Sequence, residues 1–132
     1  MKLLSNDRNG TSIFAERSMK NLNFIVECEA AGADVHPVTQ AVSALVGIIV
    51  FPWETAAFDT LKGYQLSSLY AKGWPRWNMT GTRRMVALGH LIEVLRNAAS
   101  HGGIELDSDS PKPSEVTISF KNTSHKSDDC VS

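Results

Sequence analysis

The chain has 132 residues, of which 42% are hydrophobic and 20% charged, and this size and composition predict one globular domain with a packed core. The formal net charge of −1 excludes a protein that binds nucleic acid through its overall charge. No apolar run is long enough to span a bilayer, and the two cysteines, Cys28 and Cys130, predict no disulfide framework. We therefore expect a reduced, cytoplasmic protein without membrane contact.

The first half of the sequence predicts two long helices. Residues 1–10 are polar and are expected to be loose, whereas residues 11–31 carry apolar side chains at helical spacing before Gly32. A second helix is expected to begin near His36 and Pro37, because proline suits a first helical turn. Its apolar stripe consists of Val38, Val42, Leu45 and Ile49. Further apolar residues on its other faces predict a central helix.

The next segment is less regular and leads into a further helix. Residues 55–71 predict a short or irregular helix, and Trp74 and Trp77 lie in the loop that follows. Tryptophans in such a loop can stack on bases, but we expect them to anchor the loop in the core. An N-cap within Thr80-Gly81-Thr82 predicts a helix over residues 83–100. Its core stripe is Leu88, Leu91, Ile92, Leu95 and Ala99, and Gly102-Gly103 ends it.

Beyond this helix the hydrophobic period changes to two. Apolar residues alternate with polar ones over residues 104–106 and again over residues 116–120, which predicts a β-hairpin. Residues 122–132 are polar and are expected to form a disordered tail. The sequence thus predicts a mainly α domain over residues 11–121 that ends in a short hairpin.

Positive charge gathers in the middle of the chain. Residues 72–102 contain five basic side chains and one acidic side chain, Glu93, whereas the segments on either side are acidic on balance. Such a segment would attract a phosphate-bearing ligand. Arginines are also common on helix surfaces, so charge alone leaves both explanations open.

The end of the predicted fourth helix carries residues suited to RNA cleavage. On a helical wheel, the face opposite the core stripe holds Arg83, His90, Asn97 and His101, with Ser100 at its edge and Arg96 flanking the stripe. A histidine can take the proton of a 2′-hydroxyl, and an arginine can stabilise the charged phosphate. Asn97 can position either group. This chemistry requires neither a metal nor a cofactor.

Arg96 and His101 lie five positions apart, which places them about 7.5 Å apart along a helix axis and on different faces. We therefore expect a complete site only where two antiparallel copies of this helix end meet across a two-fold axis. The sequence predicts a homodimer for this reason.

The segment Arg96-Asn97-Ala98-Ala99-Ser100-His101-Gly102 resembles the R-x4-H motif of HEPN domains (higher eukaryotes and prokaryotes nucleotide-binding). The preceding apolar run, Leu91 to Leu95, also looks like the family's, and the resemblance covers about residues 11–106. It implies an antiparallel helical bundle, a homodimer and metal-independent endoribonuclease activity in toxin–antitoxin or other defence systems. Arg96, Asn97 and His101 are carried over as catalytic residues. Residues 38–54 further resemble a small bacterial branch associated with plasmids and mobile elements.

The sequence departs from the family pattern in two places. A hairpin and a polar tail follow the motif, where many HEPN domains have another helix. Gly103 stands where a subset of HEPN toxins carries a tyrosine that a partner enzyme modifies, which puts that regulation in doubt.

Other functions are compatible with the same residues. The chain could be a non-catalytic HEPN module that binds RNA, a nucleotide or a protein partner, or a dimeric structural subunit whose polar helix end seals an interface. Arg96 and His101 could also serve the helix C-terminus, where cations are favourable. We expect an endoribonuclease with an RNA substrate and a possible antitoxin, in which Arg83, Arg84, His90 and Ser100 assist RNA binding.

Overall fold

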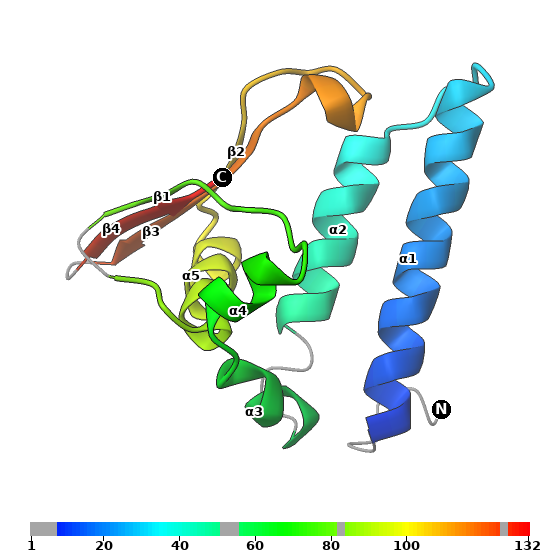
Figure 1. Ribbon diagram of the computed structural model, residues 1–132. Coiled ribbons are helices and arrows are strands. Elements are labelled where there is room, and N and C mark those ends of the chain that lie inside the picture. The colour runs from blue at the N-terminus through cyan, green and yellow to red at the C-terminus, as the bar shows by residue number, and fades with distance from the viewer. Residues whose placement is uncertain (1–7, 51–55, 82–83, 125–126) are drawn as a thin grey trace. The chain divides into compact units, whose positions relative to one another are not determined.

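The computed structural model describes residues 8–50, 56–81, 84–124 and 127–132. Its helices are α1 (Arg8–Ala30), α2 (Pro37–Val50), α3 (Ala56–Lys62), α4 (Leu66–Ala71) and α5 (Leu88–Ser100), with a short 3₁₀-helix at Pro113–Glu115. Its strands are β1 (Met79–Thr80), β2 (Ile104–Leu106), β3 (Ile118–Ser124) and β4 (Ser127–Val131) (Figure 1). The predicted mainly helical fold with antiparallel strands at its end is confirmed. None of the helices within these ranges is long and apolar enough to cross a membrane.

The chain divides into two compact units. One comprises the chain up to residue 56 together with residues 107–117, and the other comprises residues 57–106 and 118–132. The prediction of one domain over residues 11–121 stays a prediction. All the candidate site residues belong to the second unit.

In the first unit, α1 packs against α2. α1 already begins at Arg8, so residues 8–10 are helical where a loose segment was expected; residues 1–7 lie outside the described residues. α2 begins at Pro37 as predicted. The Nδ1 atom of His36 lies 3.4 Å from the backbone nitrogen of Thr39 and 3.1 Å from its hydroxyl oxygen, so His36 occupies the start of the helix.

The second unit contains a four-stranded antiparallel sheet in the order β1-β4-β3-β2. The expected hairpin is β2 with β3, in which Ile104 pairs with Phe120 and Leu106 with Ile118. The prediction of a disordered tail over residues 122–132 is wrong, because residues 122–124 and 127–131 lie in strands. Asn122 and Asp129 pair across β3 and β4 and are both buried. Buried polar residues remove the hydrophobic alternation by which a strand is recognised in sequence.

α5 packs against β3 and β4. Its buried residues are Leu88, Leu91, Ile92, Val94, Leu95 and Ala98. The predicted stripe is therefore largely correct, but Ala99 is only half-buried while Val94 and Ala98 are fully covered. A helix packed on a sheet buries a wider arc than a narrow stripe implies, and small residues such as Ala98 allow close approach.

The start of α5 differs from the prediction. The helix begins at Leu88 rather than near residue 83, and Ala87 before it is extended, with φ −104° and ψ 154°. The backbone of Leu66 donates to the carbonyl of Val86 at 2.9 Å, and Gln65 and Ala87 form a β-bridge. These long-range contacts hold residues 86–87 extended. The helix therefore does not start after residues 80–82, where its N-cap was expected. Thr82 itself lies outside the described residues.

Candidate functional site

The C-terminal end of α5 is closed by a glycine turn. The N–H of Gly102 donates to the carbonyl of Ala99 at 3.5 Å, and the N–H of Gly103 donates to that of Ala98 at 2.7 Å. Gly102 has a φ of 71°, the left-handed conformation that this pattern of two bonds requires and that glycine adopts most easily. The turn places His101 at the C-cap, directly after the last helical residue, Ser100, and its side chain is exposed.

Gly103 is held by a neighbouring strand. Its carbonyl accepts a hydrogen bond of 2.7 Å from the N–H of Lys121 in β3. A Cβ atom at Gly103 would lie only 2.0 Å from the carbonyl oxygen of Lys121, so no larger residue fits without moving the backbone. The tyrosine that some HEPN toxins carry at this position is therefore incompatible with this turn. The Lys121 ammonium donates a hydrogen bond to the Glu105 carboxylate. This bond and the negative charge of Glu105 raise the pKa of Lys121.

The three motif residues occupy the last turns of α5. Arg96 and Asn97 are half-buried, whereas Ser100 and His101 are exposed. The carbonyl of Asn97 accepts the backbone N–H of His101 at 3.1 Å, so the helical hydrogen bonding extends to the histidine, although its own φ of −106° and ψ of 12° are not helical. Arg96 and His101 therefore keep the separation of about 7.5 Å along the axis that a continuous helix imposes. Among the described residues, no group of three or more His, Cys, Asp and Glu side chains is placed to hold a metal ion.

Of the remaining RNA-binding candidates, Arg84 and His90 lie at the other end of α5. Arg84 is exposed in the extended segment before the helix, and Arg83 lies outside the described residues. His90 lies in the first turn, where its Nδ1 atom accepts the backbone N–H groups of Val86 and Ala87, each at 3.4 Å. His90 thereby satisfies donors at the helix start, which is a structural task. The structure does not bring Arg84 or His90 together with His101.

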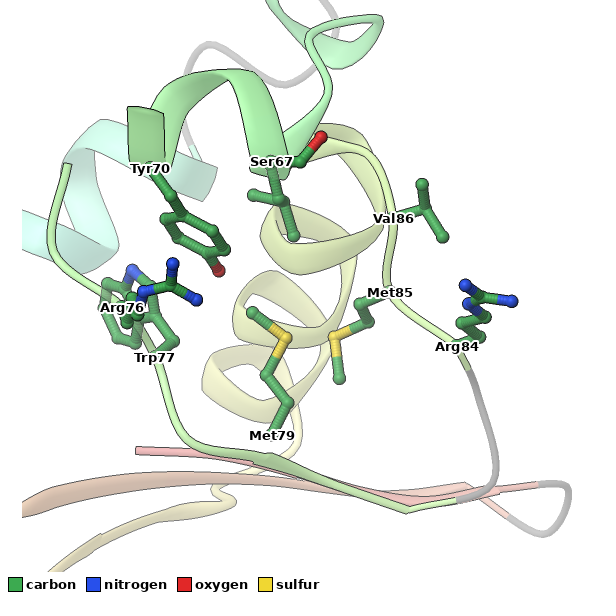
Figure 2. Close-up of a pocket in the computed structure, with 9 residues that line it drawn as sticks. Ser67, Tyr70, Arg76, Trp77, Met79, Arg84, Met85 and Val86 are labelled. Carbon is green, nitrogen blue, oxygen red and sulfur yellow. The ribbon is translucent and has the colours of Figure 1, made fainter. Parts of the chain in front are cut away.

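A pocket at this N-terminal end is the feature that the sequence did not predict (Figure 2). It has a volume of about 550 Å³. It is lined by Leu66, Ser67, Tyr70, Arg76, Trp77, Met79, Arg84, Met85 and Val86. The loop tryptophans are not both core anchors as expected: Trp74 is 49% exposed, and Trp77 lines the pocket. One sequence feature could have indicated this pocket. Residues 60–92, which include its lining, contain five basic side chains and no acidic one.

The comparison with protein families bears on the whole chain. The family model described as HEPN pEK499 p136 matches residues 1–131. No curated protein and no solved structure matches the chain. The resemblance drawn from the motif is thus confirmed, including the branch, whose name refers to a plasmid. The chain belongs to the pEK499 p136 family of HEPN proteins.

Proposed function

We propose that the protein is a metal-independent endoribonuclease of the HEPN type. The observation that carries the proposal is the exposed His101 at the end of α5, held there by the Gly102-Gly103 turn and preceded by Arg96 in the same helix. An exposed imidazole on a rigid helix end can reach a bound strand. Family membership over residues 1–131 supports the assignment.

The proposed reaction is an internal transfer at phosphorus. An imidazole nitrogen of His101 takes the proton of a ribose 2′-hydroxyl, and the 2′-oxygen attacks the adjacent phosphorus atom. The bond from phosphorus to the 5′-oxygen breaks, and that oxygen receives a proton from an imidazolium group. The guanidinium of Arg96 stabilises the charge that develops on the phosphoryl oxygens. Asn97 positions the phosphate or the imidazole, and the products are a 2′,3′-cyclic phosphate and a 5′-hydroxyl.

We propose that this site is completed by a second copy of the chain. Five helical positions separate Arg96 from His101, so the two side chains leave α5 in different directions. Two α5 ends related by a two-fold axis would bring Arg96 of each subunit beside His101 of the other. An uncontrolled ribonuclease is harmful to its host, so a neutralising antitoxin is part of the proposal, as is a role in defence.

The test compares purified parent protein with His101→Ala on a single-stranded RNA of defined sequence in the presence of EDTA. Loss of a general base or acid typically lowers the rate by about 100-fold or more. We expect the parent to leave cyclic phosphate ends, identified by mass spectrometry, and the variant to leave the RNA intact. His36→Asn is the matched control, because it replaces another exposed histidine at a helix terminus with a residue suited to a helix start.

Equal cleavage by parent and His101→Ala would refute the assignment. A parent that binds the RNA but never cleaves it, with affinity lost in Arg96→Ala, would indicate the non-catalytic HEPN module instead. A requirement for a divalent cation would exclude the proposed chemistry, since the histidine and arginine would then not suffice.

A further inference from the structure

The pocket before α5 has two cationic walls that lie on opposite sides. Figure 2 shows Arg76 on one side and Arg84 on the other, with the side chains of Met79 and Met85 between them. Both arginines are exposed, whereas both methionines are half-buried. The nine lining residues all belong to the second unit, and none of them carries a carboxylate. The pocket therefore presents an apolar surface between two separated positive charges.

An aromatic ring fixes the position of Arg76. The guanidinium carbon of this residue lies 4.9 Å from the centre of the Tyr70 ring, within the range of a cation–π contact. The contact holds the positive charge at its wall and covers one face of the ring. A flat ligand stacked on that face would compete with the guanidinium, so the arrangement favours a ligand that pairs with Arg76 through charge.

Backbone hydrogen bonds hold the pocket walls in place. The N–H of Leu66 donates to the carbonyl of Val86 at 2.9 Å, so the start of α4 is tied to the segment that precedes α5. On the other side, Asn78 and Ser132 exchange two backbone bonds of 2.8 and 2.9 Å, which continue the pairing of β1 with β4. The two arginines are therefore kept apart before any ligand binds, which reduces the ordering cost of binding.

The surface between the arginines suits an aliphatic side chain. Methionine is unbranched and polarisable, and it adapts to side chains of different shape on surfaces that bind peptides. Leu66 and Val86 extend the apolar lining that Met79 and Met85 provide. The volume of about 550 Å³ falls within the range of sites that enclose small ligands, and it accommodates a few side chains rather than a whole helix.

The surrounding sequence is positively charged. Residues 60–92 contain five basic side chains and no acidic one, so this part of the chain attracts negative charge and repels a second copy of itself. A segment that docks here is therefore acidic and differs from the residues that line the pocket.

We propose that the pocket docks an acidic, extended segment of a partner protein. An aliphatic side chain of the segment packs against Met79 and Met85, and two carboxylates on either side of it pair with Arg76 and Arg84. In an extended chain, side chains two positions apart point to the same face and are separated by about 7 Å. A segment with an acid, an apolar residue and a second acid at alternate positions therefore presents all three groups to the pocket.

Two observations favour a protein segment over other dianionic ligands. Trp77 lies on the same wall as Arg76 (Figure 2), so bases placed between two phosphates of an RNA strand would meet methionines rather than aromatic rings. Small-molecule sites bury most of their ligand, whereas both charged walls here are exposed. A segment that belongs to a larger partner gains additional contact outside the pocket, which an isolated small dianion does not.

The proposal is separate from the cleavage reaction, because His101 lies at the opposite end of α5. That helix has 13 residues and is about 20 Å long. A segment held in the pocket therefore leaves His101 of the same chain uncovered. The pocket serves as an attachment point for a protein, whether or not the chain cleaves RNA.

NMR titration of the parent protein with blocked pentapeptides tests the proposal, since the indole N–H of Trp77 reports on the pocket. The first probe is Glu-Ser-Leu-Ser-Glu at low ionic strength. Replacing one or both glutamates by glutamine should weaken binding about fivefold for each carboxylate removed. Replacing leucine by serine should weaken it about tenfold, because the apolar contact with the methionines is lost.

Substitutions in the protein show whether the two arginines bind different carboxylates. In Arg84→Gln and in Arg76→Gln, the peptides with one and two glutamates should bind equally, because one charged wall remains. Met85→Gln should remove most of the preference for leucine over serine. Lys72→Gln is the matched control, since Lys72 is an exposed cation that does not line the pocket, and it should retain the fivefold difference. Circular dichroism establishes that each variant is folded.

Equal binding of the one-glutamate and two-glutamate peptides to the parent would overturn the proposal, as would a fivefold difference that persists in both arginine variants. No change in any signal at millimolar peptide would also overturn it. A ten-nucleotide 2′-O-methyl RNA, which cannot be cleaved by its own 2′-oxygen, serves as the competing probe. Binding of this RNA in the pocket without binding of the peptides would identify a nucleic acid as the occupant.

These outcomes are independent of the proposed cleavage. A protein that docks the peptide but does not cleave RNA refutes only the nuclease assignment. A nuclease whose pocket binds no peptide refutes only this inference.

Discussion

The two ends of α5 differ in how the chain builds them. The C-terminal end is made locally, by two glycines that follow the helix and return hydrogen bonds to Ala98 and Ala99. The N-terminal end is made by distant segments, because Val86 and Ala87 are held extended by residues 65 and 66. A helix end that is held by neighbouring residues can be recognised in sequence as a short motif. A helix end that is held by distant residues leaves no contiguous sequence pattern.

This contrast also separates the two proposed tasks. The C-terminal end presents His101 on a rigid helix terminus, which suits chemistry at a fixed point. The N-terminal end carries an open pocket with charge and aromatic rings, which suits binding. Changes at one end should therefore alter one property and spare the other.

The largest effect is expected from Gly103→Ala. The new Cβ atom would lie 2.0 Å from the carbonyl oxygen of Lys121, and neither backbone can yield without breaking the Lys121–Gly103 hydrogen bond of 2.7 Å. We expect the free energy of unfolding to fall by about 3 kcal/mol, measured by urea denaturation. Cleavage should fall with it, because the turn that places His101 is lost.

The matched control for that substitution is Gly102→Ala. No atom lies within 4 Å of a Cβ at Gly102, so the only cost is its φ of 71°, which a residue with a side chain adopts at about 1 kcal/mol. A similar small loss in both variants would show that the contact with β3 does not hold the helix end, and the steric explanation would be wrong.

The second prediction concerns the composition of the cleavage site. Arg96→Ala should lower the cleavage rate about 100-fold, because it removes the group that stabilises the transition-state charge. If the site joins Arg96 of one subunit to His101 of another, mixing Arg96→Ala with His101→Ala protein should restore roughly a quarter of the parent rate. Statistical mixing makes half of the dimers mixed, each with one complete site.

The outcome of the mixture separates two arrangements of the site. No recovery in a mixture shown to exchange subunits would mean that each site uses both residues of one chain. Recovery should disappear on dilution below the dimerisation constant, which analytical ultracentrifugation determines independently.

The smallest effect is expected at the other end of the helix. His90→Ala removes the acceptor of the Val86 and Ala87 N–H groups and should lower the free energy of unfolding by about 1 kcal/mol. His90→Gln should recover part of that loss, since glutamine at this position can accept the same N–H groups. Urea denaturation measures both. An unchanged stability in His90→Ala would indicate that the strand-like pairing alone starts the helix.

Short-range patterns determined much of this protein from sequence alone. The spacing of apolar residues located α1, α2 and the body of α5, and the glycines after His101 located its end. The alternation around Ile104 and Phe120 located one hairpin, and the structure adds its register. These features depend on neighbours within a few residues or across a single turn, so the sequence displays them directly. The motif at Arg96 to His101 belongs to this class, and it led to the correct family.

Only the tertiary structure decided the features that depend on distant partners. The polar residues Asn122 and Asp129 are buried in a paired strand, which hydropathy cannot indicate, and α5 begins late because another segment pairs with residues 86–87. The same holds for the pocket, since its opposite walls come from α4 with residues 76–79 and from residues 84–86, which face each other only after folding. Hydropathy and periodicity indicate whether a residue faces solvent or the core. They do not indicate which distant segment of backbone it hydrogen-bonds or packs against.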